Sequence, residues 1–310
     1  MARDINFSNA ISGGVANTGG HSYQYVGVLA GSSSGSLISV NVSGAVSGGQ
    51  LTYAGGVVGY ATGMIEGSHF SGSVKPVRAG ARDHGFIAGG ITGALDGGSI
   101  SYSSATVQIS NATVGGGLVG SDASGSIAWS QASGSVDGQV AGGLVGASGV
   151  ANLKKSFITQ SFATASVSAN QDGGGLIGGS GGHSRAEANV SQSYATGPVT
   201  GGANAGGFVG EATDSHLTQT YATGRVSNAQ CTAGYAAYFD PSDKFRYDYW
   251  DTATTGQGDG GCFVNIHGVK GRTDLQLKDH LPKGFDPSVW GQDPNINNGW
   301  PYLLANPPQQ

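Results

Sequence analysis

The sequence carries little charge. Only 11% of its 310 residues are Asp, Glu, Lys or Arg, and the formal net charge is −5. The basic residues are scattered and form no stripe, so a nucleic-acid-binding groove is not expected. No run of about 18 apolar residues occurs, which predicts that no segment inserts into a membrane. Intrinsic disorder is also not expected, because 38% of the residues are apolar while the net charge is low.

The start of the sequence has no secretion signal. Met1 is followed by ARDINFSNA, which has neither the basic region nor the apolar region of a signal peptide. We therefore expect either a cytosolic protein or a piece of a longer exported protein whose signal lies elsewhere.

Glycine, in contrast, is abundant, with 58 residues. It does not recur at every third position, so a collagen helix is excluded. A chain that is rich in glycine, moderately apolar and poor in charge is typical of a β-structure with many tight turns.

A block of five residues, close to Gly-Gly-apolar-apolar-Gly, occurs seven times. Successive copies are 26 to 34 residues apart, a spread that is typical of loops inserted into a repeating coil. The copies end at Gly31, Gly59, Gly93, Gly120, Gly146, Gly178 and Gly210.

A second block follows each copy of the first and ends in a valine. Small residues alternate with hydroxyl residues before that valine, which predicts a half-buried strand. Because one repeat cannot bury its own apolar side chains, we expect an all-β parallel solenoid of about seven to eight stacked coils. The valines are Val46, Val74, Val107, Val136, Val167, Val199 and Val226.

The composition changes near residue 234. Most prolines and three of the four tryptophans follow this point, and charged residues become denser. The sequence therefore predicts a repeat solenoid over residues 1–234 and a small carboxyl-terminal module over residues 235–310. The aromatic side chains crowded into residues 235–250 give this module enough apolar surface to cap the last coil.

The repeats resemble GLUG-type repeats, which occur in large bacterial surface exoproteins of the filamentous-haemagglutinin kind. The resemblance rests on the GGLVG blocks and the following SYATGPV, and extends to YDYWDTATTGQ (residues 247–257) and GVKGRTDLQLKDHLPKGFDPSVWGQDPNINNGWPYLL (residues 268–304). It implies a right-handed β-helix in a secreted or cell-surface adhesin. The implied partner is a glycan or protein on a host or neighbouring cell. The resemblance implies no catalytic residue and no cofactor.

Residues five positions before the repeat valines form a candidate binding column. Strand alternation predicts that this column points outward, where stacked rings offer a flat platform for a sugar. The alternative is that the rings only stack on one another and stiffen the coil. The candidate ligand-binding residues are Phe162, Tyr194, Tyr221, Tyr102 and His69.

Carboxylates indicate two weaker candidates. Asp96 and Asp122 follow successive first blocks, so they are either the acid and base of a polysaccharide-cleaving enzyme or ordinary turn residues. The second candidate is a group of four aspartates, which form either a cation site or a charged loop: Asp240, Asp243, Asp248 and Asp251. No spacing typical of zinc ligands accompanies them.

The two cysteines, Cys231 and Cys262, are expected to form a disulfide. They are 31 residues apart, close to the length of one coil, so stacked coils would place them about one rung apart. Two buried thiols in a reducing compartment are the alternative.

The sequence leaves three functions open. We expect an adhesin that is not an enzyme, because no convincing catalytic arrangement of residues is present. A carbohydrate-active enzyme on a β-helix is the first alternative. The second is an extracellular filament subunit that associates with itself through the unpaired strand edges at the solenoid ends.

Overall fold

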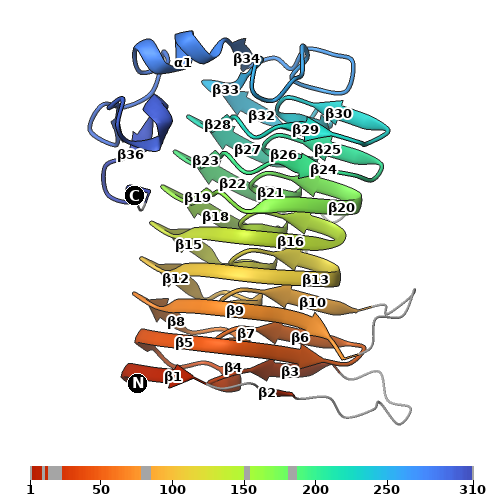
Figure 1. The fold of residues 1–310 in the computed structure, drawn as a ribbon, viewed down its shortest axis with the longest axis vertical. Coiled ribbons are helices and arrows are strands. Elements are labelled where there is room, and N and C mark those ends of the chain that lie inside the picture. The colour runs from red at the N-terminus through yellow and green to blue at the C-terminus, as the bar shows by residue number, and fades with distance from the viewer. Residues whose placement is uncertain are drawn as a thin grey trace.

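The chain winds into a stack of coils made of parallel β-strands (Figure 1). The computed structural model describes residues 2–8, 11–12, 23–77, 85–149, 154–180 and 187–308. Each strand pairs in parallel with the matching strand of the next coil, so equivalent residues form columns along the axis. The predicted all-β parallel solenoid is confirmed.

One strand of each coil lies in an eight-stranded sheet, which corresponds to eight coils. The strands are β4 (Ala30–Ser33), β7 (Val58–Ala61), β11 (Thr92–Leu95), β14 (Val119–Asp122), β17 (Val145–Ser148), β21 (Ile177–Ser180), β26 (Val209–Ala212) and β31 (Ala236–Tyr238).

The other coil strands form a 26-stranded sheet that wraps around the remaining sides. Its first side comprises β1 (Ala2–Ser8), β2 (Ile11–Ser12), β5 (Leu37–Gly48), β9 (His69–Pro76), β13 (Ser104–Gly116), β16 (Gln131–Gly142), β19 (Phe162–Ala163), β20 (Ser166–Gly174), β23 (Tyr194–Ala195), β24 (Val199–Thr200), β28 (Tyr221–Ala222), β29 (Val226–Ser227), β33 (Asp248–Asp251) and β34 (Val269–Arg272). Its second side comprises β3 (Gln24–Gly27), β6 (Thr52–Gly55), β10 (Phe86–Gly89), β25 (Asn204–Gly206) and β30 (Cys231–Ala233), together with the second halves of the long strands β13, β16 and β20.

The third side of this sheet is here called the groove face. Its strands are β8 (Met64–Glu66), β12 (Ser99–Ser101), β15 (Ser126–Ala128), β18 (Lys155–Thr159), β22 (Glu187–Ser191), β27 (Ser215–Thr218) and β32 (Lys244–Arg246). One column on these strands points into the core and is apolar, with Ile65, Ile100, Ile127, Ile158, Val190 and Leu217 all buried. The columns on either side of it point outward, as the period of two in a strand requires.

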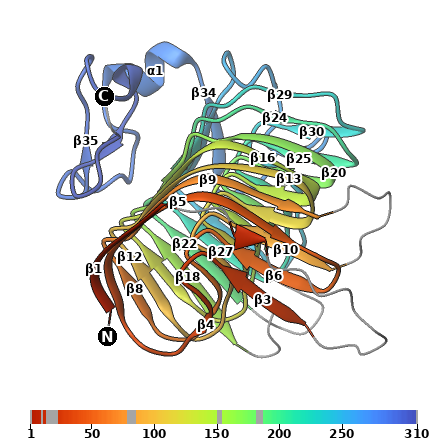
Figure 2. The ribbon, with the colours of Figure 1, turned by 60° about the horizontal axis from the view of Figure 1, so that its bottom comes forward.

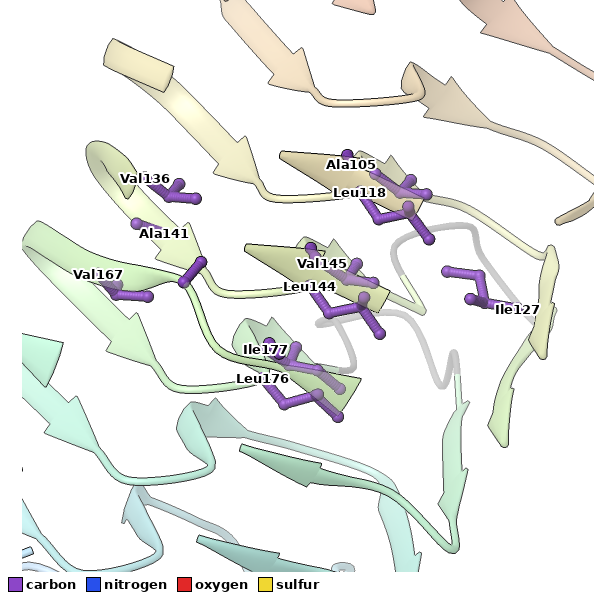
Figure 3. Close-up of a cluster of buried hydrophobic side chains, with 14 of the residues drawn as sticks. Ala105, Leu118, Ile127, Val136, Ala141, Leu144, Val145, Val167, Leu176 and Ile177 are labelled. Carbon is purple, nitrogen blue, oxygen red and sulfur yellow. The ribbon is translucent and has the colours of Figure 1, made fainter. Parts of the chain in front are cut away.

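The two apolar residues of each first block fill the core. Leu118, Leu144 and Leu176 stack at equivalent positions and are fully buried (Figure 3). Val145 and Ile177, the residues that follow two of these leucines, are register partners in neighbouring coils. The repeat therefore buries its apolar side chains only against the next repeat.

A column of buried serines lies at the start of five successive second blocks. The hydroxyl of Ser130 accepts a bond from the backbone N–H of Ser103 (3.2 Å) and donates to the carbonyl of Ala128 (2.8 Å). The same pattern joins the neighbouring coils, so these buried polar groups are paired. The column comprises Ser68, Ser103, Ser130, Ser161 and Ser193.

The solenoid continues beyond residue 234, the predicted module boundary. Strand β31 pairs with β26, β32 with β27, β33 with β28, and β34 with β33. The regular coil therefore extends to Arg272. Trp250, the register partner of Ala222, is a large residue in place of a small residue of the repeat, which hides the pattern in the sequence although the backbone pairing is retained.

The remaining segment folds back along the first side of the solenoid (Figures 1 and 2). It contains α1 (Asp274–Asp279), β35 (Trp290–Gly291), the 3-10 helix η1 (Asn297–Gly299) and β36 (Tyr302–Leu303), which pairs antiparallel with β35. Near its end, the Asn306 amide donates to the carbonyls of Ser130 (3.3 Å) and Gln160 (3.2 Å) in earlier coils. Neither α1 nor any other helix in the described ranges is long and apolar enough to cross a membrane.

Cys231 and Cys262 are bonded to each other, with their Cα atoms 5.5 Å apart. Cys231 packs against Ala233 and Ala237 at the end of the solenoid. The bond fastens the loop between β33 and β34 to the last coil, which has no further coil to pack against.

The carboxyl group of Asp122 is buried in the solenoid wall. Its Oδ1 atom accepts the backbone N–H of Gly125 at 2.6 Å. Burial raises the pKa of Asp122 to about 7, although hydrogen bonds from Gly125 and Ser124 favour the charged form. Its register partner in the next coil is Ser148.

The packing of the carboxyl-terminal segment can be tested at Trp290, which is buried against the first side. We expect Trp290→Ala to reduce stability by about 3–5 kcal/mol, the usual cost of removing a buried tryptophan, and to lower the thermal midpoint. Leu275→Ala is the matched control, since Leu275 is 79% exposed on α1. Equal midpoints for the two variants would contradict this packing.

The disulfide can be tested by mass spectrometry of protein that is denatured but not reduced. We expect neither cysteine to react with an alkylating reagent until a reductant is added. The cross-link closes a loop of 31 residues, so reduction should cost about 3–4 kcal/mol in the chain-entropy treatment. Labelling of both thiols without reductant would show that the bond is absent.

We expect Asp122→Asn to stabilise the protein in a pH-dependent way. Below about pH 4 the carboxyl group is neutral in both the folded and unfolded states. Between about pH 4 and the folded pKa of about 7, Asp122 ionises only in the unfolded state, so it lowers the free energy of unfolding more and more as the pH rises. Above that range Asp122 is ionised in both states, and its destabilising effect is constant. Urea denaturation should show a gain on the order of 1–3 kcal/mol at pH 8 and almost none at pH 4. An equal effect at both pH values would exclude a titrating Asp122.

Candidate functional site

Three residues of the predicted binding column, Phe162, Tyr194 and Tyr221, face away from the solenoid core but are buried, not exposed as predicted. Their rings stack in parallel, with centroids 4.7 and 5.1 Å apart. The carboxyl-terminal segment covers them with Phe285, Trp290 and Leu303, and the Tyr221 hydroxyl donates to the carbonyl of Pro301. The prediction failed because the covering segment lies far away in the sequence. This structure therefore shows the alternative, rings that stack on one another.

Of the other two candidates, His69 lies at an earlier position of the same register column, as predicted, whereas Tyr102 lies in a different column. His69 is exposed, pairs in register with Ser104, and its Nδ1 atom is 2.6 Å from the Ser104 hydroxyl. In the third repeat the residue opposite Val74 is Ile109, not Val107. Counting five positions back from Val107 therefore gave Tyr102, whereas the residue in register with His69 is Ser104.

Tyr102 belongs to a column at the corner between the groove face and the first side. Its half-exposed ring stacks on that of Trp129, with centroids 4.8 Å apart. The Trp129 indole donates to Gln160 (3.0 Å), which in turn donates to Gln192 (3.4 Å). Each of these residues has a left-handed backbone, with φ between 44° and 50°. The sequence interpretation missed this ladder, because the column carries no single residue type.

Asp96 and Asp122 do not form an acid and base pair. Asp122 lies inside the solenoid wall, whereas Asp96 lies at its surface. Asp96 bonds to the Lys154 ammonium (3.1 Å) and to the Tyr60 hydroxyl (3.0 Å), and the hydrogen bond from Lys154 lowers its pKa. The two carboxyl groups therefore share no common space for a substrate.

The four aspartates proposed as weak cation ligands bind backbone groups. Asp243 accepts the N–H of Ser215 (2.7 Å), and Asp248 accepts that of Thr220 (3.0 Å). Within the ranges that the structure describes, no three His, Cys, Asp or Glu residues are arranged to hold a metal ion. The group Asp240, Asp243, Asp248 and Asp251 thus stabilises turns of the last coil.

The groove face carries two hollows that share one exposed aromatic ring, Phe157. A hollow of about 330 Å³ lies on its amino-terminal side, over a glycine-rich corner with Met64, Ser99 and Ser126. One of about 460 Å³ lies on its carboxyl-terminal side, beside Asn189 and other polar residues. Phe157 itself is 48% exposed. The outward columns thus form a shallow strip that spans roughly 30 Å along the axis, six rungs at about 4.8 Å each.

The carboxyl-terminal hollow is basic. Lys244 is the register partner of His216, and Arg246 that of Thr218. All four line the hollow, together with Asn189, Ser191 and Thr159. The sequence interpretation missed Lys244 and Arg246 because it assigned them to a separate module; only the pairing of β32 with β27 places them on this face.

Comparison with known families gives one match. Residues 50–75 fit the GLUG motif. They include the block GGVVG and the second block that ends at Val74 on strand β9, close to one coil of the solenoid. A search of the curated proteins finds no match. A GLUG motif within a β-solenoid fits an extracellular β-helix protein.

Proposed function

We propose that this chain is an extracellular adhesin that attaches to a glycan along its groove face. The observation that carries the proposal is the exposed ring of Phe157 between two hollows of the same face. A sugar has an apolar face that can pack on such a ring and hydroxyl groups around its rim. Hydroxyl and amide side chains flank Phe157 in the outward columns, with Ser126 before it and Asn189 after it.

The solenoid suits attachment for a second reason. Its outward side chains are held in register by backbone pairing, so little conformational freedom is lost when a ligand binds. Weak contacts repeated along a stiff strip add up to a useful affinity for a linear ligand. Binding to a glycan on a host or neighbouring cell is the role that this arrangement favours.

A glycan array on the purified 310-residue chain tests the proposal. We expect binding, and we expect Phe157→Ala to weaken it by about 5- to 10-fold, the loss of roughly 1–1.5 kcal/mol of ring packing. Tyr238→Ala is the control, because Tyr238 is 49% exposed but lies on β31, outside the groove face. Unchanged binding by a folded Phe157→Ala variant would place the site elsewhere.

The same preparation separates the alternatives. Release of new reducing ends from a bound polysaccharide would favour a carbohydrate-active enzyme. Light scattering that rises with protein concentration would favour a filament subunit joined through the solenoid ends. An attachment protein should show neither.

A further inference from the structure

The two hollows of the groove face differ in charge. The hollow beside Met64, Ser99 and Ser126 has no charged side chain among its described lining residues. The other is lined by Lys244, Arg246 and His216 and, in the part of the chain that the structure describes, by no carboxylate. In a protein with a net charge of −5, this basic end stands out.

The two permanent cations are available to a ligand. Lys244 and Arg246 are exposed and two positions apart on β32, so both side chains leave the same side of the strand. Lys244 forms no ion pair with any residue in the described ranges. The Arg246 guanidinium lies over the Tyr247 ring, 4.8 Å from its centroid, which holds the side chain at the rim of the hollow.

A carboxylate that interacts with Lys244, that of Glu187, is already paired with another cation. Glu187 bonds to the Lys155 ammonium at 2.6 Å. Lys155 is the first cause of the lowered pKa of Glu187, and His216 and Lys244 contribute further. The combined charge of Lys155, Glu187, Lys244 and Arg246 is therefore positive, which favours an anionic group in the hollow.

We propose that the groove face selects a glycan that carries carboxylate groups, a uronate-containing polysaccharide. Lys244 and Arg246 bind the carboxylate, and Phe157, three rungs or about 14 Å away, packs on a more distant ring of the same sugar chain. Asn189 and Thr218, which line the same hollow, bind the sugar hydroxyls. The proposal rests on the proposed function and adds the chemical class of the glycan.

A uronate fits this end of the face better than a phosphate polymer does. Lys244 and Arg246 lie on the last rung of the face, whereas the hollow at the other end is lined by glycine, hydroxyl and apolar residues. A nucleic acid would need a basic stripe along its whole contact. A sugar chain needs both the ring surface of Phe157 and the polar residues beside it.

Calorimetric titration with an oligogalacturonate and with an uncharged gluco-oligosaccharide of equal length tests the proposal. We expect the uronate to bind more tightly at low salt and the preference to shrink as salt is added. The double variant Lys244→Gln/Arg246→Gln should lose roughly tenfold in affinity for the uronate and little for the neutral sugar. Lys270→Gln is the control, since Lys270 is exposed on β34, outside the hollow.

Two results would overturn the inference: equal affinity for the two sugars, or undiminished uronate binding by the folded double variant. Tighter binding of a sulfated oligosaccharide than of the uronate would also overturn the carboxylate assignment. Binding to neutral glycans on the array without binding to uronate would leave the proposed function in place. The absence of any glycan binding would overturn both.

Discussion

The close backbone contact at the corner of each first block is the constraint on which the solenoid depends. A Cβ atom on Gly116 would lie 1.9 Å from the carbonyl oxygen of Val119, and one on Gly142 would lie 1.9 Å from that of Val145. Any side chain at these positions would force the backbone apart. Glycine therefore allows the eight-stranded sheet to fold tightly onto its neighbour. Seven of the eight coils have glycine at this corner, and Ala233 takes its place in the last coil, so the coils stack in register.

Because the coils stack in register, equivalent side chains form columns. Each column either packs inside the solenoid or lies on its outside. Inward columns hold apolar residues such as Ile127 and Ile158, and the corner holds paired serines. Outward columns are free to vary between coils. On the first side the carboxyl-terminal segment covers the stacked rings of Tyr194 and Tyr221, whereas on the groove face Phe157 is exposed. An outward aromatic side chain thus stabilises the fold on one side and offers a contact on another.

Because the chain has few charged residues, its exposed charges have a larger share in determining which ligands it attracts. Backbone pairing and small side chains hold the coils together, and surface ion pairs between coils contribute little further stability. Lys154 and Lys155 pair with carboxylates of other coils, whereas Lys244 and Arg246 line an open hollow. Cations in such a position strengthen contacts to an anionic ligand and set its position along the face.

The sequence by itself determined the features that depend on local pattern. The glycine blocks and the alternation before residues such as Val136 were sufficient to predict the parallel solenoid. The spacing of Cys231 and Cys262 was sufficient to predict that they lie close together. The tertiary structure decided what depends on distant segments: the end of the solenoid at Arg272, the burial of Phe162 beneath the carboxyl-terminal segment, and the position of Lys244 on the groove face. Parallel pairing uses backbone groups, so a coil can form without the side chains of the repeat and then shows no repeat pattern in the sequence. A segment that folds back over the coils has no repeat pattern either.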